Sequence, residues 1–217
     1  MRPGHGRVRG IGHAFLRRHA GHLWSELQAR PLLRTRGLLV VSLTELGDRD
    51  CLDEAIEVSE VMLHLDAEDR LGVRMMLAPL YLVRRRFDEL RELLARFEGD
   101  GMLPLRWVGV MQSFVAGGGI AATRLLPSVH ERNPFAIAFL SGARRLPRYR
   151  PEGYVIGSEE EAIACADTLR PALRSMPKFR TWLKSVAAAG DAASEGAVGA
   201  GPLRVGRMRR VRASPRS

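Results

Sequence analysis

The chain has few of the residues on which cross-links, metal cages and membrane spans depend. Its 217 residues include two cysteines, Cys51 and Cys165, too few for a disulfide framework or a cysteine-based metal site. The longest apolar run, residues 75–83, includes a proline and falls short of the roughly 18 residues that a membrane span needs. The first residues lack the apolar core of a secretory signal peptide. We therefore expect a cytoplasmic protein with no membrane span, whose cysteines are reduced and structural.

Lysine is almost absent, because 32 of the 34 basic residues are arginine, a bias that we attribute to codon usage. The net charge of +10 is concentrated at the two ends of the chain. Residues 1–30 hold six arginines against one acidic residue, and residues 187–217 hold six against two. The last segment is also rich in Ala, Gly and Ser and has no aromatic residue, which is typical of disorder. We expect a disordered basic arm at 1–12, a helical domain at 13–186 and a disordered Arg-rich tail at 187–217.

Sequence motifs of catalysis and cofactor binding are also missing. There is no Walker loop, no G-x-S-x-G and no H-E-x-x-H. Gly117, Gly119 and Ala122 satisfy G-x-G-x-x-A, but helical spacing before them favours a turn between helices. His19 and His22 share a helix face without further metal ligands nearby. We therefore expect no catalytic residue, no cofactor and no metal site, and hence no enzyme.

What the sequence does contain is a series of amphipathic helices joined by short turns. Apolar residues recur at helical spacing, and glycine or polar clusters end each run. Three pairs follow one another, with helices expected at 31–46 and 52–65, at 71–85 and 87–97, and at 103–116 and 120–132. Flanking helices are expected at 13–27, where Leu16, Leu23 and Leu27 share one face, from Ser158 onward, and at 178–186. Ser158 and Glu161 have the spacing of a capping box.

The second helices of the three pairs share a register. Ala55, Leu90 and Ala122 occupy the same place in LDEAIEVSEVML, FDELRELLARFE and IAATRLLPSVHE, 35 and then 32 residues apart. A helical hairpin of this length cannot bury both faces alone, so copies stack. The period and the residues at the helix crossing resemble the tetratricopeptide repeat, although its Trp-Leu-Gly-Tyr set is missing. The predicted fold is all-α: a right-handed solenoid of about three tetratricopeptide-like helical hairpins with N- and C-terminal flanking helices.

Several stretches together resemble the bacterial relatives of the tetratricopeptide-containing suppressor-of-tumorigenicity-seven family. They are GHLWSELQARPLLRTR at 21–36, LDEAIEVSEVMLHLDAEDRLGVR at 52–74, and NPFAIAFLSGARRLP followed by GYVIGSEEEAIACA at 133–147 and 153–166, with Trp182-Leu183 after them. Relatives carry more chain before the Trp24 helix, and some have a Cys-rich zinc module that two cysteines exclude here. The resemblance implies a helical-repeat interaction protein with no established chemistry and names no partner.

A non-catalytic protein–protein interaction scaffold is the first functional hypothesis. First helices of such stacks line a concave groove that holds a peptide or a partner helix. We expect arginines to pair with carboxylates, and Met and aromatic side chains to form apolar pockets. The candidate positions are Arg34, Arg74, Met75, Arg106, Trp107, Met111 and Phe114. A role of Trp107 and Phe114 in the core remains an equal alternative.

The second hypothesis is a sequence-nonspecific nucleic-acid-associated protein that acts through its basic tails. Arg204 to Arg216 and the N-terminal arm would neutralise phosphates with a steep salt dependence. The tail has no aromatic residue to stack on bases, so such binding would not depend on sequence. The basic amphipathic helix at 13–27 is better explained by docking on the first hairpin than by lying on a membrane.

Overall fold

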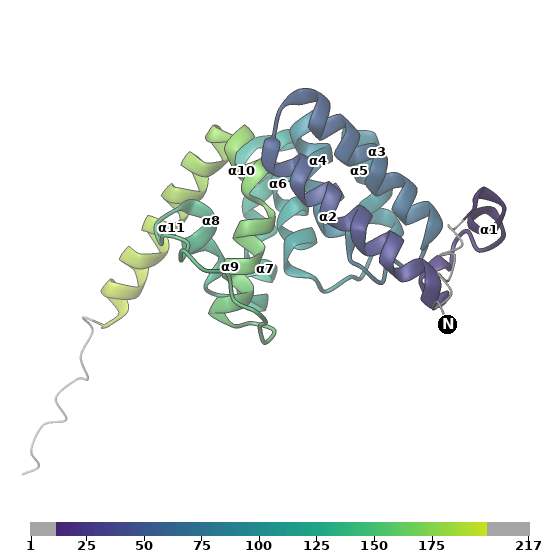
Figure 1. Ribbon diagram of the computed structural model, residues 1–217. Helices are drawn as coiled ribbons and strands as arrows, with labels where there is room; N and C mark the ends of the chain where they lie inside the picture. The colour runs from purple at the N-terminus through teal and green to yellow at the C-terminus, as the bar shows by residue number, and fades with distance from the viewer. Residues whose placement is uncertain (1–11, 199–217) are drawn as a thin grey trace, which may run out of the picture.

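The computed structural model describes residues 12–198, with side chains described over 12–189, and every regular element in that range is helical (Figure 1). The described part contains no strand, only an isolated bridge between His22 and Asp66. The expected all-α class is thereby confirmed. The helices are α1 His13–Arg18, α2 Arg30–Leu46, α3 Arg49–Leu65, α4 Val73–Arg84, α5 Phe87–Arg96, α6 Leu103–Thr123, α7 Leu126–Arg132, α8 Ala136–Ser141, α9 Glu159–Thr168, α10 Arg170–Ser175 and α11 Pro177–Val198.

The first two hairpins, α2 with α3 and α4 with α5, lie where the apolar spacing predicts them. Gly47 ends α2 in the left-handed region at φ 73°, and its N–H donates to the Leu43 carbonyl at 3.1 Å. Asp48 then caps α3 by accepting from the Cys51 N–H at 2.9 Å. Because this cap lies so close behind Gly47, α3 begins at Arg49, three residues earlier than expected.

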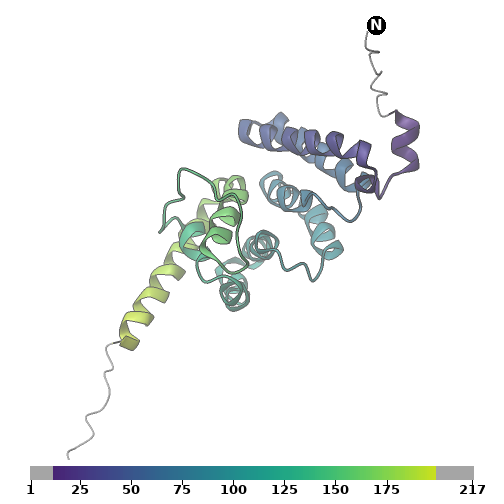
Figure 2. The same cartoon turned by 60° about the horizontal axis from the view of Figure 1, so that its bottom comes forward.

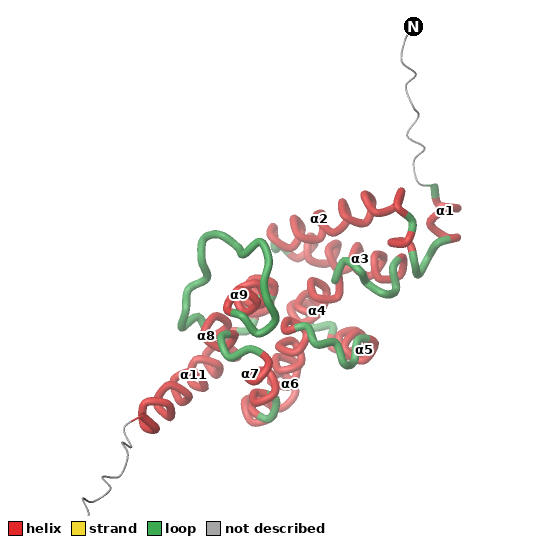
Figure 3. Tube along the Cα trace, turned by 90° about the horizontal axis from the view of Figure 1, so that it is seen from below, coloured by secondary structure: helices red, strands yellow, loops and turns green. Residues whose placement is uncertain are grey.

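The shared register of the second helices corresponds to shared burial. Ala55 on α3, Leu90 on α5 and Ala122 near the end of α6 each have no exposed surface. Successive helices pack side by side, α3 against α4 and α4 against both α5 and α6 (Figure 3). One main hydrophobic core runs from α2 to α11. The two ends of the described chain lie far apart (Figure 2).

The third pair differs from the expectation at its glycines. The helix does not stop at residue 116, because α6 continues through a kink to Thr123. Gly117 and Gly118 hold the non-helical torsions, and Gly118 has a φ of 67° that side chains rarely adopt. The expected helix at 120–132 is therefore two short pieces, the end of α6 and then α7.

The helix expected at 13–27 is wrong as a single element. α1 ends at Arg18, Gly21 turns the chain at φ 90°, and two 3₁₀ turns follow at Leu23–Ser25 and Leu27–Ala29. Gly21 forms two hydrogen bonds with the chain around the end of α3. Its N–H donates to the His64 carbonyl, and its carbonyl accepts from the Ala67 N–H. The docking on the first hairpin is confirmed, because Leu23 packs in a small cluster with residues of α2 and α3, among them Leu33 and Leu65.

The C-terminal helices fold back on the hairpins. α8, which lies in a stretch that we interpreted as a connector, packs on α9 and α11, and α10 packs on α4. The Ser158 hydroxyl caps α9 as expected, at 3.2 Å from the Glu161 N–H. The Glu161 carboxylate does not complete the capping box, because it accepts from Gly157 N–H at 2.6 Å and from the Asn133 amide at 3.1 Å instead.

The last helix is longer than the sequence indicates. α11 runs to Val198 instead of ending at 186, so residues 187–198, which we placed in the disordered tail, are helical. Its C-terminal end extends away from the other helices (Figure 1). The remaining parts of the expected arm and tail, residues 1–11 and 199–217, lie outside the described residues.

Candidate partner-binding groove

A hollow of the described chain lies between the first two hairpins and the C-terminal helices. Its volume is about 770 Å³, within the range of sites that hold ligands. Met76, Pro79 and Val83 recur at helical spacing on one face of α4, and this face lines the hollow. We call this hollow the α2–α10 groove; its other lining residues are Val41, Thr44, Glu45, Leu46, Gly47, Leu52, Arg150, Asp167, Thr168, Arg170, Pro171, Arg174 and Ser175.

One wall of the α2–α10 groove is apolar and open to solvent. Leu46 is 70% exposed and Val41 is 38% exposed, both on α2. Leu38 and Leu39 on the same helix are also exposed. Contiguous exposed apolar patches that are surrounded by polar residues are typical of interaction sites.

The opposite wall is cationic. Arg170 and Arg150 both pair with Asp167, which lies between them. Arg174, one helical turn after Arg170, is exposed and has no carboxylate partner among the described residues. This wall therefore offers the unpaired guanidinium of Arg174 to an acidic group of a partner. On the α2 side, the acidic lining residue Glu45 directly precedes Leu46.

The residues proposed from the sequence do not come together in this groove. Arg34 is exposed near the start of α2, where its guanidinium lies 5.5 Å from the centre of the Trp24 ring and Arg30 lies 5.2 Å from it. Arg106 is exposed on α6. Neither arginine lines the α2–α10 groove.

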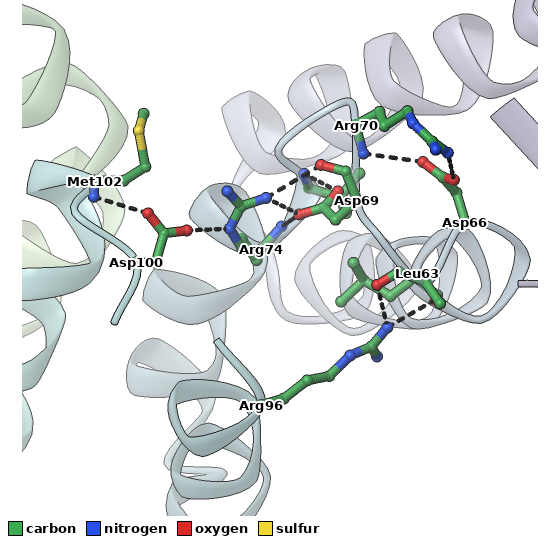
Figure 4. A network of polar contacts seen from close by, with 10 residues as sticks. Leu63, Asp66, Asp69, Arg70, Arg74, Arg96, Asp100 and Met102 are labelled. Carbon is green, nitrogen blue, oxygen red and sulfur yellow. Dashed lines mark hydrogen bonds and ion pairs between the residues drawn. The ribbon is translucent and has the colours of Figure 1, made fainter. Parts of the chain in front are cut away.

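Arg74 is held inside the protein by two carboxylates (Figure 4). Its Nη1 lies 2.9 Å from Asp69 and its Nε lies 2.6 Å from Asp100. The guanidinium also stacks over the Phe97 ring at 4.9 Å. The Nε and Nη1 donors of Arg74 therefore bind the turns before α4 and α6. Arg74 does not line the α2–α10 groove, and its contact with a partner stays a prediction.

The apolar candidates are core or partly core. Trp107 and Met111 have no exposed surface, so the core alternative holds for Trp107. Phe114 is partly buried and packs 5.3 Å from the rings of Phe179 and Trp182. Met75 is partly buried against the core, and the next residue of α4 lines the groove in its place.

The groove residues that sequence reasoning missed left one signal. Residues 38–41 of α2 read LLVV, which is more apolar surface than a helix with one buried face requires. Val40 is buried there, whereas its neighbours on either side are exposed. Arg170 and Arg174 left no comparable signal, because nothing local shows that α10 packs on α4.

Other kinds of site find no support in the described part of the chain. Across residues 12–189, His, Cys, Asp and Glu do not gather into a group that could hold a metal ion. Within the same described portion, no helix has the length and apolar character to cross a membrane. The G-x-G-x-x-A glycines lie inside α6 at its kink. The nucleic-acid hypothesis concerns segments outside the described residues and stays a prediction.

Comparison of the chain with models of known protein families, with curated proteins and with solved structures finds no match in any of the three. The resemblance to the suppressor-of-tumorigenicity-seven family therefore also stays a prediction.

Proposed function

We propose that the protein is a non-catalytic interaction scaffold that binds a peptide or a partner helix in the α2–α10 groove. The observation that carries this proposal is the pairing of an apolar wall, exposed on α2 and buried to half-buried on α4, with a cationic wall on α9 and α10. A partner with an apolar stripe and flanking Asp or Glu residues would complement both walls at once.

The architecture supports the same proposal. Hairpins that recur after 35 and then 32 residues, with equivalent positions buried, are consistent with a right-handed tetratricopeptide-like solenoid related to the suppressor-of-tumorigenicity-seven proteins. In such a stack the first helices face the ligand, and α2 and α4 are the first helices of their hairpins. Because α10 packs on α4, the open part of that face is short. We therefore expect affinities of about micromolar strength.

The apolar wall is expected to supply most of the binding free energy. Burying a fully exposed leucine side chain contributes about 1.5–3 kcal/mol, and Leu46 is 70% exposed in the free protein. Pairing of a partner carboxylate with Arg174 contributes more to selectivity than to affinity, since an exposed ion pair is worth about 0–1 kcal/mol. The apolar contacts should therefore decide whether a peptide binds, and the charges should decide which one.

Selection of peptides from a random display library on the full-length protein tests the proposal. Enriched sequences are expected to combine apolar residues at i and i+4 with Asp or Glu, and their dissociation constants can be measured by fluorescence anisotropy. Leu46→Glu and Val41→Glu are expected to weaken binding at least about tenfold. Ile120→Glu is the matched control, because Ile120 is 80% exposed and does not line the groove.

The cationic wall has its own arm of the test. Arg174→Glu is expected to weaken acidic peptides several-fold and to leave peptides with Asn and Gln in place of Asp and Glu unchanged. Arg106→Glu serves as the control, because Arg106 is exposed on another helix. If no peptide is enriched, or if the wild type and Leu46→Glu bind the peptides equally, then the α2–α10 groove is not a peptide-binding site.

A further inference from the structure

A second hollow lies on the other side of α10 and is lined by arginines. Its volume is about 310 Å³, and five guanidinium side chains line it: Arg144, Arg145, Arg170, Arg174 and Arg180. No acidic residue of the described chain lines it. We call it the arginine hollow.

Three separate segments bring these arginines together. α8 ends at Gly142, whose left-handed φ of 81° turns the chain so that Arg144 and Arg145 follow directly at the rim. Arg170 and Arg174 lie four residues apart and therefore share one face of α10. Arg180 comes from the first part of α11.

The positive charge of the arginine hollow is only partly neutralised. Arg144 forms a two-bond pair with Glu159 at 2.7 and 2.8 Å, and Arg170 pairs with Asp167. Arg145, Arg174 and Arg180 have no carboxylate partner within the described part of the chain. Three unpaired guanidinium groups around one small hollow repel each other unless an anion lies between them.

Arg180 is the most confined of the three. Its Nε atom is buried and has no hydrogen-bond partner among the described residues. Its Nη2 lies so close to Gly142 that a Cβ there would be only 3.1 Å away. An unpaired buried donor costs about 1–3 kcal/mol, and an ion that is absent from a structure is one physical reason for such a group.

We propose that the arginine hollow is an anion site that takes a phosphate group. Arginine forks match the oxygens of phosphate, and a phosphomonoester carries close to two negative charges at neutral pH. Apolar side chains such as Phe139 and Leu173 also line the hollow, so it suits a phosphate carried on a small organic body. The site is distinct from the proposed peptide groove, because Arg145 and Arg180 line only the arginine hollow.

Titration calorimetry on the full-length protein, with phenyl phosphate and inorganic phosphate at constant ionic strength, tests this site. One site per chain is expected, with a dissociation constant of about 0.1–1 mM. Tighter binding of phenyl phosphate identifies an organic phosphate as the ligand, and equal binding identifies free phosphate. Arg145→Gln and Arg180→Gln are each expected to weaken binding about tenfold.

Arg106→Gln is the control, because it removes one exposed arginine elsewhere and should leave the affinity unchanged. Arg145 is exposed, so Arg145→Gln should leave the fold intact and still test the site if Arg180→Gln lowers stability. Two results overturn the proposal: no binding of either phosphate at 10 mM, about tenfold above the expected range, or weak binding that Arg145→Gln leaves unchanged. The second result would mean counterion association with the arginine-rich ends.

Discussion

Gly119 lies where α11 crosses α6, and the indole ring of Trp182 fills the space beside it. A Cβ at this position would lie 2.7 Å from Cδ1 and Nε1 of that ring. The ring cannot easily move, because it packs against Phe114 and Phe179 at 5.3 and 5.4 Å. Gly119→Ala is therefore expected to lower the free energy of unfolding by about 1–3 kcal/mol, measured by chemical denaturation.

Gly109→Ala in the same helix is the matched control. A Cβ at Gly109 meets no atom within 4 Å, and Ala is favoured over Gly in a helix by about 0.5–1 kcal/mol. We expect this variant to be as stable as the wild type or more stable. If Gly119→Ala unfolds at the same denaturant concentration as Gly109→Ala, then Trp182 does not pack on the kink of α6.

Cys51 is a second residue whose surroundings make a measurable prediction. Its hydrogen bond with the Asp48 side chain, followed by burial, raises the pKa of the thiol to about 11 from an ordinary value of 9.0. Since only the thiolate reacts, alkylation by iodoacetamide at pH 8 should be about 100-fold slower than for an unperturbed cysteine. Mass spectrometry of the native protein gives the rate at each pH.

Asp48→Asn removes the negative charge and keeps a capping side chain, so it should lower the pKa of Cys51 and speed its alkylation. Burial raises the pKa of Cys165 well above its ordinary value, so this second thiol should stay slow in both proteins. Native Cys51 that reacts as fast as free cysteine would contradict the assigned contact with Asp48.

At the scale of elements, the turns between hairpins are held by a chain of charged contacts (Figure 4). Asp69 has a φ of 50° and accepts from the N–H groups of Val73 and Arg74 at 2.7 and 2.9 Å, so it caps α4. Arg74 pairs with Asp69 and with Asp100, and Asp100 accepts from the Met102 N–H at 2.8 Å before α6. One guanidinium thus connects the starts of two successive hairpins.

Arg74→Met should be strongly destabilising, because it leaves the buried Asp69 carboxylate without its cation. Asp69 is 4% exposed, and breaking a buried pair from one side costs about 3–5 kcal/mol. Arg91→Met is the control, since Arg91 pairs with Asp88 on an exposed helix surface and should change stability by less than about 0.5 kcal/mol. Thermal unfolding of both variants compares them, and similar midpoints would contradict the structural role of Arg74.

The helices with a regular apolar period and a local stop could be predicted, and those that depend on distant contacts could not. α2 has Gly47 at its end, and the sequence places the helix within one residue. The 13–27 stretch has the same kind of period, but Gly21 bonds to the end of α3, and this distant contact breaks the helix. α8 is only six residues long, too short for a period to show.

At the scale of the whole molecule, the sequence indicates which helices face the groove and misses which residues do. The first helices of the first two hairpins do line it, but α4 presents Met76 instead of Met75, a rotation of one residue. The first helix of the third pair, α6, does not line the groove. α9 packs on α6 and α10 packs on α4, so the C-terminal helices supply the second wall, and no local pattern encodes where they dock.

The two proposed sites share part of α10, and this predicts a coupling between them. Arg170 and Arg174 line both the α2–α10 groove and the arginine hollow. A bound phosphate would engage Arg174 and leave less positive charge for an acidic peptide. We therefore expect saturating phenyl phosphate to weaken an acidic peptide about fivefold, and the peptide to weaken phenyl phosphate by the same factor, because such coupling is reciprocal.

Arg174→Gln should remove this coupling, because it deletes the group that both ligands use, while Arg145→Gln should keep the coupling once the phenyl phosphate concentration is raised to offset its weaker binding. A peptide with Gln in place of its acidic residues should bind with the same affinity whether phenyl phosphate is present or not. Fluorescence anisotropy at constant ionic strength separates this effect from general screening. If both ligands bind and neither changes the affinity of the other, then Arg174 does not serve both sites, and α10 acts as a wall between two independent sites.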